Sequence, residues 1–147
     1  MEQTYLEKND GGVERLRALV GRLGDDELAR ELEGGWTVAA ALAHVAFWDR
    51  YVVARWELAQ RLGLRIPANI DGAAAGLIND ASLEIWRALP PKAAAQQALD
   101  AAEYAARFIA GLGADSAEAA MSAGNPRLVD RTPHWIEHIE QIERALA

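Results

Sequence analysis

One long stretch without an internal glycine or proline, residues 37–62, constrains the fold of this chain most. Gly34 and Gly35 precede it and Gly63 follows it, so helix-breaking residues stand only near its two ends. Thr37 is suited to cap a helix here, because its hydroxyl can accept a hydrogen bond from a free backbone amide. At 1.5 Å per residue, about 25 residues span roughly 37 Å, which is enough to cross a small domain. The stretch therefore predicts a helix of a helical bundle.

Apolar residues recur at helical spacing elsewhere in the chain and predict further helices. We expect long helices over residues 13–23, 71–89, 92–112 and about 130 to 147, a short one over 27–32, and a turn of helix at 116–121. Residues 1–10 are polar and lead into Gly11 and Gly12, so this end is expected to fray or to be helical only through packing. The helix over 71–89 is expected to face the core through Ala74, Leu77, Ile78, Ala81, Ile85 and Leu89.

The composition favours a single all-α domain over residues 1–147, a four-helix bundle with short extra helices. The chain has 147 residues, which is the size of one domain, and it is 51% hydrophobic with 5 prolines. Few segments show the alternation of β-branched and polar residues that strands require. The absence of cysteine excludes disulfides, thiolate metal ligands and a protein thiol nucleophile.

The charge and hydropathy of the chain limit the kinds of partner that we expect it to bind. A net charge of −7 and a pI near 4.9 would repel the phosphates of nucleic acid, so we expect no nucleic-acid partner. The longest nearly apolar window, residues 36–48, is too short to span a membrane, so no membrane association is expected. No signal-like N-terminus is present, and the cytoplasm is the expected compartment. Alanine-rich helices and five tryptophans leave apolar surface to cover, which favours a homodimer.

Three histidines carry the clearest chemical signal. His134 and His138 lie four residues apart in the last helix, so both imidazoles can point to one place, as in a metal chelate. Trp135, Ile139, Ile142 and Leu146 form the apolar stripe of this helix, and the two histidines flank it. The same position also suits two solvated surface histidines. His44, the one other histidine, lies within residues 37–62, with small residues one turn before it and large aromatic residues one turn after it. This arrangement leaves a recess beside the ring, so His44 is either a metal ligand or a residue of the core.

Two motifs of the chain resemble those of a known family. GWTV at residues 35–38 and LAHVAFWD at residues 42–49 resemble the signature of the DinB/YfiT-like superfamily, which includes the N-terminal domain of mycothiol-dependent maleylpyruvate isomerase. DRTPHWIEHI at residues 130–139 is similar to the H-x-x-x-H helix of that family. The likeness covers most of the chain in length, in helix order and in the long gap between the first histidine and the pair.

The resemblance implies a four-helix bundle that holds a divalent metal, zinc or nickel in many members, through one histidine of the second helix and two of the last. By position these ligands are His44, His134 and His138. The chain ends at Ala147, so the resemblance does not extend to the additional C-terminal domain of the full-length isomerase or to its specific activity. Asp130 and Asn79 are candidates to hold the outer nitrogen of a ligand imidazole, although Asp130 also suits a helix-terminal acid.

Two functions of different classes agree with these features. The first is a metal-dependent enzyme that acts on a small-molecule substrate, either a hydrolase or a transferase that uses a low-molecular-weight thiol as cosubstrate. No catalytic residue beyond the three metal ligands is assigned, and the missing cysteine means that any thiol comes from outside the chain. The alternative is a non-catalytic small-molecule-binding or protective protein of the same fold, with some of the five tryptophans lining its recess.

Overall fold

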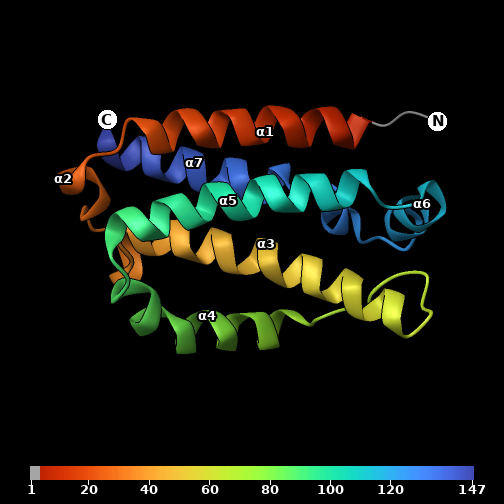
Figure 1. Ribbon diagram of the computed structural model, residues 1–147. Helices are drawn as coiled ribbons and strands as arrows, with labels where there is room; N and C mark the ends of the chain where they lie inside the picture. The colour runs from red at the N-terminus through yellow and green to blue at the C-terminus, as the bar shows by residue number, and fades with distance from the viewer. Residues whose placement is uncertain (1–3) are drawn as a thin grey trace.

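The computed structural model describes residues 4–147, and within them every regular element of secondary structure is a helix, with no strand (Figure 1). Its seven α-helices are α1 (Thr4–Gly21), α2 (Asp25–Leu28), α3 (Val38–Arg61), α4 (Gly72–Arg87), α5 (Pro91–Ala110), α6 (Ala114–Ser122) and α7 (Thr132–Leu146). Two 3-10 helices, η1 (Glu33–Gly35) and η2 (Pro126–Leu128), lie between them. The predicted all-α fold is confirmed.

Four long helices form the bundle, because α1 packs against α5 and α7, and α3 packs against the same two helices. The fifth long helix, α4, lies outside this ring and packs against α3 (Figure 1). A large cluster of buried apolar side chains fills the bundle, and a smaller one, which includes Tyr5, Trp56 and Val129, fills the end near α6. No described helix is both long enough and apolar enough to cross a membrane.

The long helix predicted over residues 37–62 is confirmed as α3. The Thr37 hydroxyl accepts a hydrogen bond from the Ala40 amide at 3.0 Å, which caps the helix as expected. Every residue from Val38 to Ala46 is buried, since neighbouring helices cover this half of α3 on several sides. Helix α3 is therefore the central element of the fold, and its first half carries His44.

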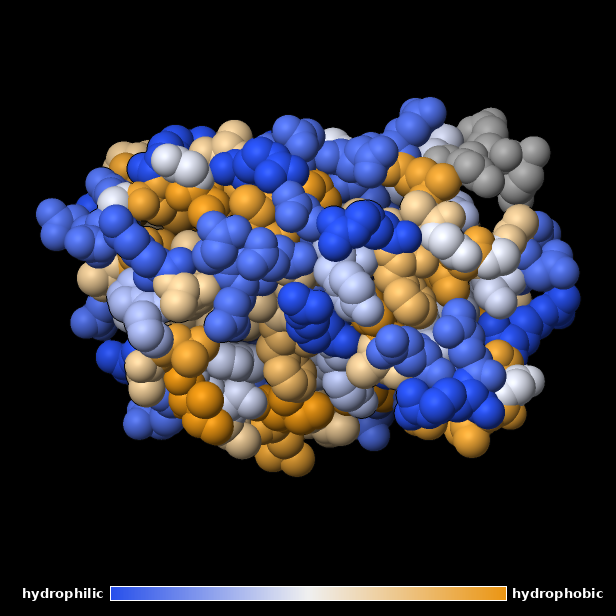
Figure 2. All heavy atoms as spheres, in the orientation of Figure 1, coloured by the Kyte–Doolittle hydropathy of each residue, from blue (hydrophilic) through white to orange (hydrophobic). Residues whose placement is uncertain are grey.

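Helix α4 presents a different face to the core than its sequence pattern predicts. Leu77 is 68% exposed and Ile85 is 65% exposed, so the expected core face is wrong at these positions. The inward side carries Ile78, which was predicted to face the core, together with Asn79 and the buried Trp86, which were not. The pattern is ambiguous because apolar residues stand side by side at 77–78 and 85–86, and α4 lies outside the ring of four helices with α3 as its main neighbour. Hydrophobic surface appears in Figure 2 along the lower edge, where α4 lies in this orientation.

Helix α1 begins earlier than its polar sequence predicts, at Thr4, and it runs through both glycines. Gly12 is buried against α7, where a Cβ atom would lie 2.7 Å from Cε3 of Trp135. The glycine therefore permits a close approach of two helices, and the packing that results holds the N-terminal turns helical. The part of the fraying prediction that concerns residues 1–3 lies outside the described residues.

Smaller differences concern the ends of the short elements. The predicted segment 27–32 is helical only over α2, at residues 25–28, and the predicted turn at 116–121 is the nine-residue helix α6. Helix α6 buries Ala117 and Ala120 against its surroundings, which small side chains allow. Packing of alanine, which gives a weak hydrophobic signal in sequence, accounts for this underestimate.

Candidate metal centre

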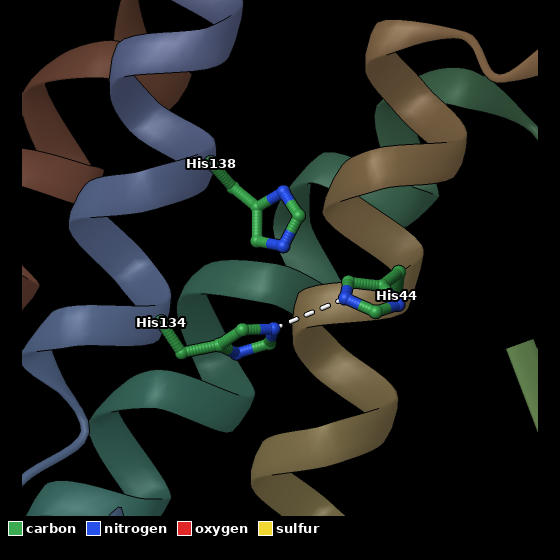
Figure 3. A group of neighbouring side chains, drawn as sticks. All are labelled: His44, His134 and His138. Carbon is green, nitrogen blue, oxygen red and sulfur yellow. Dashed lines mark hydrogen bonds between the residues drawn. The ribbon is translucent and has the colours of Figure 1, made fainter. Parts of the chain in front are cut away.

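The structure brings His44, His134 and His138 together (Figure 3). His134 and His138 project from successive turns of α7 toward α3, which supplies His44. One ring nitrogen from each histidine can be chosen so that the three atoms lie within 4.8 Å of one another. The closest pair is Nε2 of His44 and Nε2 of His134, at 3.0 Å. The sequence-derived expectation that the three side chains converge agrees with this geometry.

Packing on both sides of the cluster fixes the rings. On α7, Trp135 and Ile139 are buried in the bundle core, which orients the flanking histidines toward α3. Three tryptophans surround His44 in edge-to-face contacts, with ring centroids 5.4 Å away for Trp36, 6.5 Å for Trp48 and 5.5 Å for Trp86. His44 and His134 are buried and His138 is half-buried, so the cluster opens to solvent on the side of His138.

Amide oxygens hold the outer nitrogens of two of the rings. Nδ1 of His44 lies 3.1 Å from Oδ1 of Asn79, and the same oxygen accepts a hydrogen bond from Nε1 of Trp48 at 2.8 Å. An indole nitrogen only donates, so the Asn79 atom is an acceptor and His44 carries its proton on Nδ1. Nδ1 of His138 lies 3.0 Å from Oε1 of Gln141, which fixes the same tautomer. Both rings are thus left with an unprotonated Nε2, the form that binds a metal.

The third ring has a different environment. Nδ1 of His134 lies 3.5 Å from Nη2 of Arg131, a group that only donates. Because Asn79 keeps the His44 proton on Nδ1, the short contact between the two Nε2 atoms requires the proton of His134. A metal ion bound by both rings would take the place of this proton. Two ligands on a tetrahedral zinc ion lie about 3.3 Å apart, close to the separation of this pair, and the nitrogen of His138 lies within 4.8 Å of both, so the three imidazoles could hold a divalent metal.

Two of the three histidines are kept neutral by their surroundings. Burial and, more weakly, the nearby His138 lower the pKa of His44 to about 4, although the hydrogen bond to Asn79 opposes the shift. Burial also lowers the pKa of His134, and the charge of Arg131 acts in the same direction. Since neutral imidazole is the metal-binding form, both residues are in the ligand state at neutral pH.

A buried polar network positions the start of α7 beside His134. Nε of Arg131 donates to Oδ1 of Asp49 at 2.9 Å, and Nε1 of Trp135 donates to Oδ2 of Asp49 at 2.7 Å. The Arg131 backbone amide donates to Oδ1 of Asn9 at 3.0 Å, which ties α1 to the same point. Burial raises the pKa of the Asp49 carboxyl, while the Arg131 charge and the hydrogen bond from Trp135 oppose this shift. Asp49, Arg131 and Asn9 were not identified from sequence.

Of the two predicted supporting residues, Asn79 contacts a histidine of the cluster and Asp130 does not. Oδ1 of Asp130 accepts hydrogen bonds from the Thr132 amide, at 3.1 Å, and from its hydroxyl. Asp130 is therefore a helix-terminal acid beside Thr132, the first residue of α7. Gln141 was missed, although its spacing of three residues from His138 on the same helix places the two side chains together.

A cavity of about 740 Å³ opens beside the histidines. Its walls come from α3, α4, α7 and the connections between helices, and Nδ2 of Asn125 donates to Oδ1 of Asn69 at its rim. The lining comprises Trp36, Ala41, His44, Trp48, Val52, Arg55, Asn69, Ile70, Gly72, Ala75, Asn79, Asn125, Arg127, Arg131, His134, Glu137, His138 and Gln141. Among the described residues, no serine, threonine, tyrosine or lysine side chain lines this cavity, so it offers no hydroxyl or amine nucleophile.

Fold and site together define a helical-bundle protein with a three-histidine cluster able to hold a metal at the floor of an open cavity. The sequence profile of the DinB superfamily matches residues 10–142, which is most of the chain and includes all three histidines. The protein belongs to the DinB superfamily, a family of four-helix bundles, as the two sequence motifs indicated. Comparisons with curated proteins and with solved structures gave no match.

Proposed function

We propose that this protein is a metal-dependent enzyme in which His44, His134 and His138 hold a divalent metal, zinc or nickel, that acts on a small molecule in the adjacent cavity. The observation that supports this most is the tautomer control at the cluster. Asn79 and Gln141 leave Nε2 of His44 and of His138 unprotonated next to His134. Surface histidines do not need such partners, whereas metal ligands usually have them.

The reaction class follows from what the cavity contains and lacks. A divalent metal held by three neutral imidazoles lowers the pKa of a bound water to about 7, or binds a thiol as its thiolate. No hydroxyl, amine or thiol side chain lines the cavity within the described residues, so the chain itself supplies none of these nucleophiles. Hydrolysis by water and transfer to a low-molecular-weight thiol are therefore the two reactions that we propose.

Glu137 is the residue best placed to move a proton in either reaction. It lies between the two histidines of α7 in sequence, lines the cavity and is exposed. A carboxylate here can accept a proton from water or from a thiol in the cavity. Trp36 and Trp48 form an apolar wall that orients the substrate.

A second candidate function is non-catalytic binding of a small molecule. The size of the cavity, about 740 Å³, falls in the range of ligand pockets, and its tryptophan wall suits a flat or apolar ligand. In this case the histidines would serve as hydrogen-bonding groups without metal, and their replacement would leave the metal content unchanged at zero.

Elemental analysis of untagged protein purified without chelator distinguishes the two functions. The wild type is expected to contain about one zinc or nickel per chain, and His138→Ala should lose the metal and with it the hydrolysis or thiol transfer of model electrophiles. Gln141→Ala and Asn79→Ala should weaken metal affinity by about 10- to 100-fold, because each removes the partner of an outer nitrogen. Gln97→Ala, a surface substitution outside the histidine cavity, is the control. A metal-free wild type, or a His138→Ala protein with full turnover, would contradict the proposal.

A further inference from the structure

We propose that Arg55 and Arg127 form an anion subsite in the cavity, which binds a carboxylate or phosphate group of the substrate while the opposite end of that molecule lies at the histidines. The inference rests on the proposed function, because it assigns the substrate class of the same cavity. Both arginines line the cavity, Arg55 from α3 and Arg127 from η2.

The spacing along α3 sets the distance between the two ends of the substrate. Arg55 follows His44 by eleven residues, which is about three turns, so the two side chains share a face and their Cα atoms are roughly 16 Å apart along the axis. Trp48 and Val52 lie between them on the same cavity wall. An arginine side chain in a helix points back toward the N-terminus, here toward His44, which shortens this gap. The substrate is therefore an elongated molecule with an apolar middle.

The charges on the cavity wall favour an anion. Arg55 and Arg127 form no ion pair with any carboxylate in residues 4–147, whereas Arg131 is paired with Asp49. Nη2 of Arg55 donates to the Ala68 carbonyl at 2.6 Å, which orients the guanidinium without neutralising it. Among the described residues, Glu137 is the one acidic residue in the lining. The cavity thus carries local positive charge although the net charge of the protein is −7, and this local potential favours an anion inside the cavity.

The guanidinium of Arg55 lacks a counter-charge in a partly buried place. Burial lowers its pKa, the nearby Tyr51 opposes this shift, and the nearby Arg131 adds to it. An anion bound between Arg55 and Arg127 would oppose the two effects that lower this pKa. A guanidinium binds two oxygens of one carboxylate or of one phosphate through two parallel hydrogen bonds. Both are therefore candidates for the anionic group of the substrate.

Binding of small anions to metal-free protein tests the subsite independently of the metal. The probes are succinate and inorganic phosphate, with succinamide as the uncharged analogue of succinate, and binding is followed by calorimetry and by tryptophan fluorescence. Arg127→Gln and Arg55→Gln should each weaken binding about 10-fold, which corresponds to about 1.4 kcal/mol. Arg127→Lys should lose less, since it keeps the charge, and Arg107→Gln on the exposed side of α5 should change nothing. The anion that binds with the higher affinity identifies the chemical class of the anionic group on the substrate.

The outcomes separate this proposal from the metal proposal. If the wild type binds neither anion, binds succinamide as well as succinate, or binds anions equally after both arginine substitutions, the anion subsite is wrong. If anions bind only to metal-loaded protein and independently of the arginines, the metal alone binds them and the subsite is again wrong. If the wild type proves metal-free but shows arginine-dependent anion binding, the metal proposal fails and the subsite stands. Circular dichroism and elemental analysis of each variant verify that fold and metal content are unchanged.

Discussion

Two adjacent glycines in α1, Gly11 and Gly12, should respond in opposite ways to the same substitution. A Cβ atom at Gly11 would meet nothing within 4 Å, because this residue faces solvent. A Cβ atom at Gly12 would lie 2.7 Å from Cε3 of Trp135 and 2.9 Å from Cγ2 of Thr132. Gly11→Ala is therefore a matched control for Gly12→Ala, with the same helix and the same change in backbone freedom.

The expected magnitudes follow from two effects. Alanine is more favourable than glycine in a helix interior by about 1 kcal/mol, so Gly11→Ala should raise the free energy of unfolding by up to this amount. Gly12→Ala has the same gain but overpacks the contact between α1 and α7, at a cost of about 1–3 kcal/mol. Trp135 cannot rotate away easily, because its ring is fully buried and its Nε1 donates to Asp49. The difference between the two variants, about 1–3 kcal/mol, measures the packing cost alone.

Urea unfolding followed by circular dichroism measures this difference at pH 7 in metal-free protein. Gly12→Ala should unfold at lower urea concentration than Gly11→Ala with an unchanged m-value, and its midpoint temperature should be lower by about 2–4 °C per kcal/mol. Equal stability of the two alanine variants, or a Gly12→Ala protein more stable than the wild type, would refute the close approach of α1 to α7 and the reasoning built on it.

Two further predictions concern acid and assembly. Burial lowers the pKa of His44 to about 4, while an unfolded imidazole keeps about 6.5, so the unfolded state binds more protons between these values. In metal-free protein, the contribution of His44 to the free energy of unfolding should therefore fall by about 3 kcal/mol as pH falls from 6.5 to 4. Equal free energies of unfolding in urea at the two pH values would contradict this. We also expect a homodimer in which a second copy covers Leu77 and Ile85 on α4, so that Leu77→Asp gives a 16.0 kDa particle by light scattering. A wild type that already scatters as a monomer at micromolar concentration would contradict the dimer.

The sequence predicted those features that depend on local spacing. The uninterrupted stretch behind α3, the Thr37 cap and the i, i+4 pair His134 and His138 are all properties of a single helix, so short-range rules suffice. The placement of His44 beside the pair required the family resemblance, because no local pattern relates residues that lie 90 positions apart.

The features that the sequence did not predict depend on contacts between helices. Asp49 and Arg131 are 82 positions apart, and a charged residue in an amphipathic stretch usually faces solvent, so their buried pairing leaves no local signal. The exposure of Leu77 and Ile85 on α4 was not predicted for a similar reason, since neighbouring residues such as Leu77 and Ile78 are equally apolar and the contact with α3 selects between them. Asp130 was a poor candidate for binding a histidine because the Thr132 amide and hydroxyl lie nearer along the chain.

The charge balance of the centre explains why one carboxylate lies so deep in the bundle. Asp49 is the only fully buried acid among the described residues, and it faces Arg131, whose Nη2 lies 3.5 Å from His134. Without Asp49, the positive charges of Arg131 and of a divalent ion would repel each other across a single imidazole ring. The carboxylate neutralises the arginine but would leave the charge of a bound ion uncompensated, and Arg55 and Arg127 add further positive charge along the wall. In a metal-loaded site of the kind that we propose, negative charge from a bound ligand would therefore complete the balance.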